Sequence, residues 1–274
     1  GLAGVLLAIE AKSGLPWLVF AMTGGPVAAA AANGLHLFGW KRPWIRPRWI
    51  RISDSETKIL FSTGILFFIL QLSYSLIFAS DNLIAAQVLG PIEVSKYSIV
   101  QKMFSVALLA VNIILLPLWP AYGEAITRRD ISWVRKTLVY SLFLCLMIAG
   151  IPSFVFVIFG SQIIQYWVGS VISPSLPLLV GFWVWTILYT GGSVVGTFLN
   201  AVSVLKFQVV IALITSVVSL VMKFYLAKAI GLPGIIWGAV AGYAVFSVIP
   251  LLFYVPKLLS EKILCNESYL KAEV

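Results

Sequence analysis

The chain has 274 residues, of which 61% are hydrophobic and only 11% are charged, and its mean hydropathy is +1.02. Soluble domains are closer to half apolar and a quarter charged, so this composition excludes a soluble globular enzyme and indicates a membrane protein. The formal net charge is +9, and the positions of the basic residues must first be tested as topology signals. The two cysteines, Cys145 and Cys265, are too far apart in sequence to suggest a disulfide framework or a metal site.

The first apolar run, 1–9, is too short to span a membrane and lacks the basic flank of a signal peptide. We therefore expect the end of a helix here, and a chain that is the C-terminal fragment of a larger transporter-like protein. Seven complete hydrophobic segments follow, and backbone groups in lipid must bond internally, so each is predicted to be a helix. The segments are 15–38, 58–80, 96–120, 134–159, 175–200, 206–229 and 233–256.

The predicted fold is therefore all-α, a polytopic transmembrane helix bundle of about seven full spans and an N-terminal stub. Its loops are short except for 39–57 and 121–133, which leaves no room for a catalytic domain outside the membrane. Fourteen Lys and Arg residues fall on one side of the segmented chain and five on the other, so the positive-inside rule places the richer side and the C-terminus in the cytoplasm. Most of the positive charge is thereby explained as topology.

The longest basic segment, 41–51, interleaves aromatic with basic residues. We interpret it as a cytoplasmic linker anchored at the membrane interface by Trp40, Trp44 and Trp49. Binding of acidic lipid headgroups is the alternative, and we expect no nucleic acid as a partner.

Four spans carry polar residues at helical spacing, and lipid does not satisfy such groups. They could line a solvated path together, or simply bond neighbouring helices or their own preceding carbonyls. The four stripes are Gln71, Tyr74, Ser75, Asp81 and Asn82; Ser98, Gln101, Lys102, Ser105 and Asn112; Thr186, Thr190, Ser193, Thr197 and Asn200; and Gln208, Thr215, Ser219 and Lys223.

Three ionisable members of these stripes need separate interpretations. Lys102 lies about 9 Å inside the outer boundary of its span, close enough for its stem to reach water, and Lys223 is also nearer the outer face. Asp81 falls at the outer end of its span. For each residue, a snorkelling or ion-pair role competes with a cavity role, as a cation for an anionic substrate or as a carboxylate for a coupling ion.

Glycines and prolines form two further patterns. Gly192 and Gly196 are spaced by four, as are Gly234, Gly238 and Gly242, which predicts close helix packing. Pro117 and Pro120 remove two backbone donors near the end of the span 96–120, so the helix is expected to kink or stop there, either as a gate element or as a simple stop.

No pattern in the chain predicts catalysis. The single histidine, His36, has no carboxylate near it in sequence, and no Ser/His/Asp set, Walker-type loop or metal-ligand cluster occurs. We expect a chain that is not an enzyme and has no metal or cofactor, and for which ATP-driven transport by itself is not expected.

An ordered set of short runs resembles the O-antigen and polysaccharide flippases of the multidrug, oligosaccharidyl-lipid and polysaccharide exporter superfamily. The runs are 80–90 (SDNLIAAQVLG), 94–97 (VSKY) leading to 101–104 (QKMF), 116–125 (LPLWPAYGEA), 129–136 (RDISWVRK), 166–169 (YWVG) and 198–200 (FLN) followed by Phe207 and Gln208. The similarity extends from about residue 15 to 256, nearly all of the chain, although each run alone is weak.

The resemblance implies a two-lobed helical transporter whose lobes enclose a central cavity and alternate its access. Residues 1–38 would then end the first lobe, 39–57 would be the basic linker, 58–256 the second six-helix lobe and 257–274 a cytoplasmic tail. Members of the family move undecaprenyl-diphosphate-linked glycan units across the bacterial inner membrane, coupled to an ion gradient. The implied partners are the lipid-linked oligosaccharide, membrane lipids, the missing N-terminal lobe, and polysaccharide polymerase and glycosyltransferases.

The mechanism that we expect places the anionic glycan-diphosphate headgroup in a wet cavity. Lys102 would compensate its charge, while Gln71, Gln101, Asn112 and Asn200 would bind sugar hydroxyls. Asp81 would carry a coupling proton or sodium ion, or neutralise Lys96 or Lys102. Tyr74, Asn82 and Lys223 complete the expected cavity.

Three alternatives remain open, and one of them, suggested by the missing start of the chain, is a non-catalytic scaffold or a pseudogene fragment. A multidrug exporter of the same superfamily would require acidic residues deep in the cavity, and none lies well inside a predicted span. A membrane-embedded polysaccharide polymerase would require charged catalytic residues in an outer loop, and the loop 160–174 has none.

Overall fold

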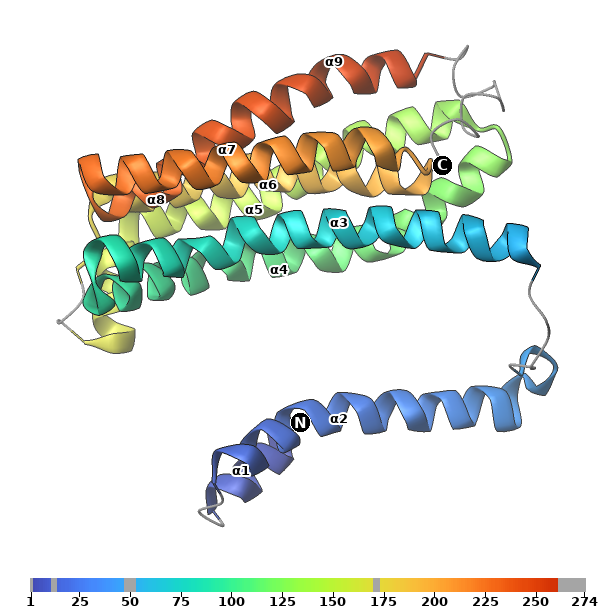
Figure 1. Cartoon of the computed structure of the whole chain (residues 1–274), viewed down its shortest axis with the longest axis horizontal. Coiled ribbons are helices and arrows are strands. Elements are labelled where there is room, and N and C mark those ends of the chain that lie inside the picture. The colour runs from blue at the N-terminus through green and yellow to red at the C-terminus, as the bar shows by residue number, and fades with distance from the viewer. Residues whose placement is uncertain (1, 11–13, 47–52, 170–172, 261–274) are drawn as a thin grey trace. The chain divides into compact units, whose positions relative to one another are not determined.

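The computed structural model describes residues 2–10, 14–46, 53–169 and 173–260. Within them the chain forms helices and no strand, which confirms the all-α prediction (Figure 1). The chain divides into two compact units, Gly1–Asp54 and Ser55–Val274. In the first, α1 (Leu2–Glu10) packs against α2 (Leu15–His36), and two short turns follow, η1 (Leu37–Lys41) and η2 (Pro43–Ile45).

The second unit is the main helix bundle. Its helices are α3 (Asp54–Ile84), α4 (Pro91–Thr127), α5 (Ile131–Val168), α6 (Leu176–Ala201), α7 (Leu205–Ile230), α8 (Leu232–Tyr243) and α9 (Ile249–Leu258). Two π-helical turns, η3 (Ala85–Leu89) and η4 (Ala244–Val248), extend α3 and join α8 to α9.

Seven helical segments of the described chain are long and apolar enough to cross a membrane, as predicted for a multi-pass membrane protein. They are Pro16–Lys41, Asp54–Leu89, Pro91–Thr127, Ile131–Val168, Leu176–Ala201, Leu205–Ile230 and Leu232–Leu258. The N-terminal stub forms α1 from Leu2 to Glu10, which is too short to belong to this set. Residues 47–52 of the expected linker and 261–274 of the expected tail lie outside the described residues.

Several helices are longer than the hydrophobic segments predict. The loop expected at 121–133 is mostly helical, because α4 continues to Thr127 and α5 begins at Ile131, where the Asp130 side chain accepts a hydrogen bond from the Trp133 backbone N–H at 3.0 Å. Of the two outcomes expected at Pro117 and Pro120, a kink or a stop, the stop is therefore wrong, since both lie inside α4. Their missing donors are local losses that the tertiary packing of a 37-residue helix overrides.

Tight connections keep consecutive helices close together. Gly90 joins η3 to α4 with φ of 99°, and Gly231 joins α7 to α8 with φ of 72°, a region that side chains disfavour. A proline at the start of α4 or α8 follows each glycine, where its missing N–H costs no helical bond. These turns place α3 beside α4 and α7 beside α8.

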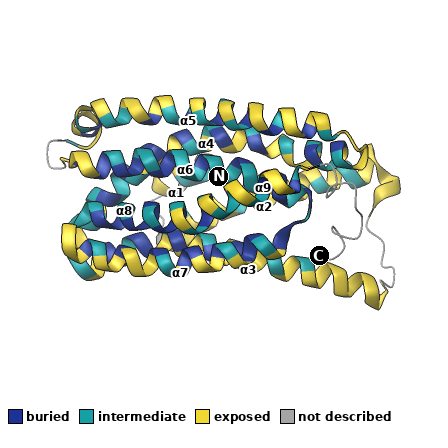
Figure 2. Ribbon diagram, turned by 90° about the horizontal axis from the view of Figure 1, so that it is seen from above, coloured by how far each residue is buried: buried dark blue, intermediate teal, exposed yellow. Residues whose placement is uncertain are grey.

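The hydrophobic core of the bundle has two large clusters that share α4, α5 and α6. Leu179, Phe182 and Trp185 of α6 belong to the first, and Val194 and Phe198 to the second. The buried residues of α5 recur every three or four positions from Val134 to Ser153, which leaves a long exposed side on this helix (Figure 2). Helix α3 adds a small cluster of its own against α7, through Leu70, Leu205, Val209 and Ala212.

Candidate functional site

A first cavity, here called the neutral cavity, has a volume of about 400 Å³ and opens where α3, α4, α6 and α7 meet. Four residues of the predicted site line it together: Gln71, Tyr74, Asn112 and Asn200. Ser193, Thr197 and Gln208, from two of the predicted stripes, lie in the same wall. The spacing of polar residues on four separate helices thus does bring one face of each toward a common space.

The walls of the neutral cavity combine amides and hydroxyls with aromatic rings. Phe67 of α3 and Trp119 of α4 line it as a tilted pair with ring centroids 6.1 Å apart, and Tyr189 and Tyr243 also line it. The Gln208 amide donates to Asn200 Oδ1 at 3.0 Å, which fixes both side chains. None of the residues that line this cavity is acidic or basic.

A second cavity, here called the charged cavity, has a volume of about 450 Å³ and is lined by residues of α3, α4, α6 and α8. Asp81, Gln101 and Lys102 of the predicted site line it, together with Ser75, Ser105 and Thr186. The expected single cavity is therefore divided, because Lys102 and Gln101 lie in a different pocket from Gln71, Asn112 and Asn200. Lys102 is exposed at the surface of the bundle.

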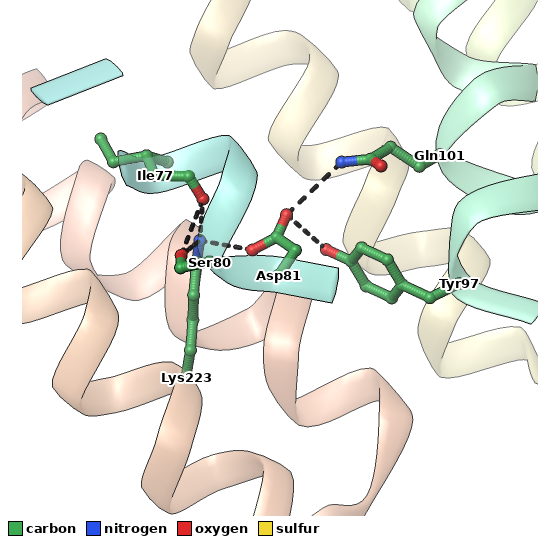
Figure 3. A network of polar contacts seen from close by, with 6 residues as sticks. All are labelled: Ile77, Ser80, Asp81, Tyr97, Gln101 and Lys223. Atoms are coloured by element: carbon green, nitrogen blue, oxygen red, sulfur yellow. Dashed lines mark hydrogen bonds and ion pairs between the residues drawn. The ribbon is translucent and has the colours of Figure 1, made fainter. Parts of the chain in front are cut away.

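Asp81, which lines the charged cavity, forms a buried ion pair with Lys223 (Figure 3). Lys223 of α7 is 0% exposed, and its Nζ lies 2.5 Å from Asp81 Oδ1. The ammonium also donates to the Ile77 carbonyl at 2.5 Å and to Ser80 Oγ at 3.4 Å, so all three of its N–H groups have acceptors. A buried charge without such partners would be strongly destabilising.

The other oxygen of the Asp81 carboxylate binds α4. Tyr97 Oη donates to Asp81 Oδ2 at 2.9 Å, and the Gln101 amide approaches the same oxygen at 3.5 Å (Figure 3). Asp81 thus connects three helices, α3, α4 and α7. Tyr97 is fully buried, and nothing in its position one residue after Lys96 marks it as a partner of Asp81.

This arrangement corrects two predictions. Asp81 neutralises neither Lys96 nor Lys102, since its partner is Lys223, while Lys96 pairs with Glu93 at 2.6 Å. Lys223 does not reach water by snorkelling, because the side chain turns inward between helices, and the ion-pair interpretation holds instead. The contact joins residues 142 positions apart, which a pattern within one helix does not reveal.

Glycines of α8 explain how Lys223 becomes buried. A methyl group added at Gly238 would meet the α7 backbone at Lys223, and one added at Gly234 would meet the backbone at Leu226. At Gly242 it would meet Ser219. The glycine spacing therefore predicts correctly that two helices pack backbone to backbone here. Likewise, Gly192 makes room for the Tyr243 ring.

The stripe on α7 is largely a packing surface rather than the wall of a wet path. Thr215 and Ser247 share a hydrogen bond of 2.8 Å, and Ser219 is buried against α8. Of this stripe, Gln208 lines the neutral cavity, whereas Thr215 lines only a small pocket of about 30 Å³. Asn82, also expected in the cavity, lines neither the neutral nor the charged cavity and instead accepts a hydrogen bond from Ser98 at 3.0 Å.

The stripe on α6 satisfies both interpretations that the sequence leaves open. Thr186, Ser193 and Thr197 each donate to the carbonyl four residues before, at 2.8 to 2.9 Å. All three also line a cavity. The aromatic walls are what sequence reasoning missed, although their side chains lie on the same helical faces as the polar stripes. Within the described residues, no three His, Cys, Asp or Glu side chains gather closely enough to hold a metal ion.

Comparison with known proteins found no match, whether among protein-family models, curated proteins or solved structures.

Proposed function

We propose that this chain takes part in moving an undecaprenyl-diphosphate-linked oligosaccharide across the bacterial inner membrane by alternating access. The observation that carries the proposal is the neutral cavity, in which amides, hydroxyls and aromatic rings from four membrane helices surround a space without charged side chains. The order of short runs along the chain, which resembles polysaccharide flippases, supports the same substrate class.

The chemistry of the neutral cavity suits an uncharged sugar. Each sugar hydroxyl both donates and accepts, and Gln71, Asn112 and Asn200 offer both kinds of group. Aromatic faces such as Trp119 suit the apolar faces of sugar rings. Polar groups that fix orientation among apolar walls are typical of small-ligand sites.

The charged cavity suits the diphosphate of the same substrate. Lys102 offers a cation that water can reach, and the Gln101 amide and the Ser105 hydroxyl lie in the same wall. Charge-assisted hydrogen bonds of this kind are stronger than neutral ones. A cationic drug is a poorer fit, because the carboxylate of Asp81 is already neutralised by Lys223.

The coupling ion in this proposal is a proton. The Asp81 carboxylate borders the charged cavity, but Lys223 occupies the position beside it that a sodium ion would need. A proton needs no such position, and by removing the counter-charge of the buried Lys223 it breaks the ion pair in this scheme. The groups that face Asp81 and would respond with it are Lys223, Tyr97 and Gln101, with Lys102 in the same cavity.

The proposal also retains the partners that the resemblance implies. These are a second helical lobe, the surrounding membrane lipids, and the polymerase and glycosyltransferases that consume and supply a lipid-linked glycan. No ATP is required in this scheme, and the chain acts as a carrier rather than an enzyme.

A transport assay tests the proposal. The protein, expressed as its gene encodes it, is reconstituted in vesicles that contain a fluorescent polyprenyl-diphosphate oligosaccharide, and the fraction of glycan accessible outside the vesicles is followed with time. Asn112→Leu and Gln71→Leu should reduce the rate about tenfold, as expected when a polar contact is lost inside a cavity. Ile113→Leu, which changes an exposed neighbour of Asn112, should leave the rate unchanged. No glycan movement by the unmodified protein, with export of cationic dyes instead, would contradict the proposal.

A further inference from the structure

Two openings lie on either side of α3, and only one of them is lined by charged side chains. One is the charged cavity. The other, here called the apolar groove, has a volume of about 610 Å³ and lies between α3 and α7, where Leu76, Leu83, Leu220 and Phe224 are among the residues that line it. Ala79 is the one residue that lines both openings.

Helical periodicity explains how one residue borders both openings. Ser75 and Phe78 face the charged cavity, and Leu76 and Leu83 face the groove, so Ala79 stands between these two sides on the exposed crest of α3. Two and three turns earlier, the same crest carries the large exposed side chains Leu72 and Phe68. Because Ala79 has a small side chain, the exposed face of α3 projects least at the residue that borders both openings.

The contrast in chemistry across Ala79 matches the two ends of a lipid. The charged cavity presents Lys102 with amide and hydroxyl groups among aromatic side chains, and the groove is apolar apart from Ser80, Gln87 and Tyr225 at its wall. Ser80 is buried and bonds Lys223, and it therefore separates the groove from the ion pair between Asp81 and Lys223. An anionic headgroup therefore fits the first opening, which holds Lys102, and the groove, which holds no charged side chain, suits a hydrocarbon chain.

We propose that a lipid with a phosphate or diphosphate headgroup binds across α3, with its headgroup at Lys102 and its hydrocarbon chain in the apolar groove, passing over the helix at Ala79. That the headgroup carries a glycan rests on the proposed function. Binding of the lipid phosphate itself does not depend on that function. A helix with its side chains is about 10 Å wide, so the chain must be longer than this to reach the groove.

A competing arrangement is a membrane phospholipid that enters the groove from its other end. Lys228 Nζ lies 4.2 Å from the centre of the Phe224 ring, so a cation is also present near the groove wall. In that arrangement the headgroup would bind Lys228 and never enter the charged cavity. Binding depends on Lys102 and Ala79 in the first arrangement and on Lys228 in the second.

Photolabelling distinguishes the two arrangements. The full chain is reconstituted in phosphatidylcholine vesicles with a polyprenyl diphosphate that carries a diazirine in its chain, and the labelled peptides are identified by mass spectrometry. We expect labelling around Leu220 and Phe224. Lys102→Ala and Ala79→Phe should each reduce it about tenfold, as expected for the loss of one charge-assisted contact or of the passage over α3.

Matched control variants complete the experiment. Leu72→Phe adds bulk on the same crest two turns away, and Lys228→Ala removes the competing cation, so both should leave labelling unchanged. Labelling that persists in both Lys102→Ala and Ala79→Phe, labelling lost in Lys228→Ala, or no labelling of the groove at all would overturn the inference. Labelling that depends on Lys102 and Ala79 without glycan transport would remove only the proposed function, whereas transport without this dependence would remove only the inference.

Discussion

Helix α7 packs closely against α8 but only at separate points against α3. Against α8 it packs along its length through Gly234, Gly238 and Gly242, so the two backbones nearly touch. Against α3 it makes one small hydrophobic cluster around Leu70 and one ion pair, Asp81 with Lys223. The α7–α8 seam leaves no space for a ligand, whereas the attachment of α3 leaves room for both cavities and the groove.

This difference indicates how a membrane bundle can hold a polar site. The seam fixes the position of Lys223, and the ion pair then holds α3 and, through Tyr97, α4 in place. A few polar contacts thereby replace the broad apolar packing that would otherwise fill the cavities. We expect the seam to respond to added volume and the α3 attachment to respond to lost charge.

The largest expected effect comes from breaking the ion pair on one side. Asp81→Leu leaves the Lys223 ammonium buried without its counter-charge and should lower the free energy of unfolding by about 3 to 5 kcal/mol. The double variant Asp81→Leu with Lys223→Met should recover most of that loss, because neither charge is then buried. Thermal unfolding in detergent measures both variants.

The control for that experiment is an ion pair at the surface. Lys96→Gln breaks the half-exposed pair with Glu93 and should change stability by less than about 1 kcal/mol. Equal losses in Lys96→Gln and Asp81→Leu would show that burial of the pair does not hold α3.

The seam should respond to a single methyl group. Gly238→Ala places a carbon against the α7 backbone at Lys223 and should cost about 1 to 3 kcal/mol through overpacking. Gly64→Ala adds the same methyl to the exposed interior of α3, where nothing lies within 4 Å, and should stabilise by up to about 1 kcal/mol. Chemical unfolding of the two variants side by side gives the comparison, and a loss in both would argue against a special seam.

A smaller effect is expected where α4 joins the ion pair. Tyr97→Phe removes one hydrogen bond to the buried Asp81 carboxylate and should lower the free energy of unfolding by about 1.5 kcal/mol. Tyr140→Phe, on the exposed side of α5, removes a hydroxyl outside the core and should be neutral within about 0.5 kcal/mol. An unaffected Tyr97→Phe variant would mean that Asp81 does not tie α4 to α3.

The smallest effect on stability is expected at the other lysine of this region. Lys102→Ala should change the free energy of unfolding by less than about 0.5 kcal/mol, because Lys102 is exposed and Lys223 is buried. Binding of a polyprenyl diphosphate, measured by the photolabelling described above, should nevertheless fall. A Lys102 variant that unfolds would place this lysine among the structural residues instead.

Much of the neutral cavity was predictable because its residues follow the helical period. Gln71, Tyr74, Asn112 and Asn200 lie on the polar faces of three spans, and polar faces in a membrane turn toward one another. The same rule misplaces Asn82 and most of the α7 stripe, since Asn82 bonds Ser98, Thr215 bonds Ser247 and Lys223 bonds Asp81. Periodicity identifies the face of a helix that avoids lipid but does not distinguish a packed face from a wet one.

The sequence by itself determined the membrane class, the number of spans and the close packing at the glycines, because each of these depends on residues near one another along the chain. Only the tertiary structure decided that Asp81 pairs with Lys223, that Lys102 lies apart from the sugar-sized neutral cavity, and that Ala79 separates a polar from an apolar opening. These facts depend on which helices become neighbours and how they are rotated about their axes. That choice is made by side-chain packing summed over the whole bundle, which no single stretch of sequence contains.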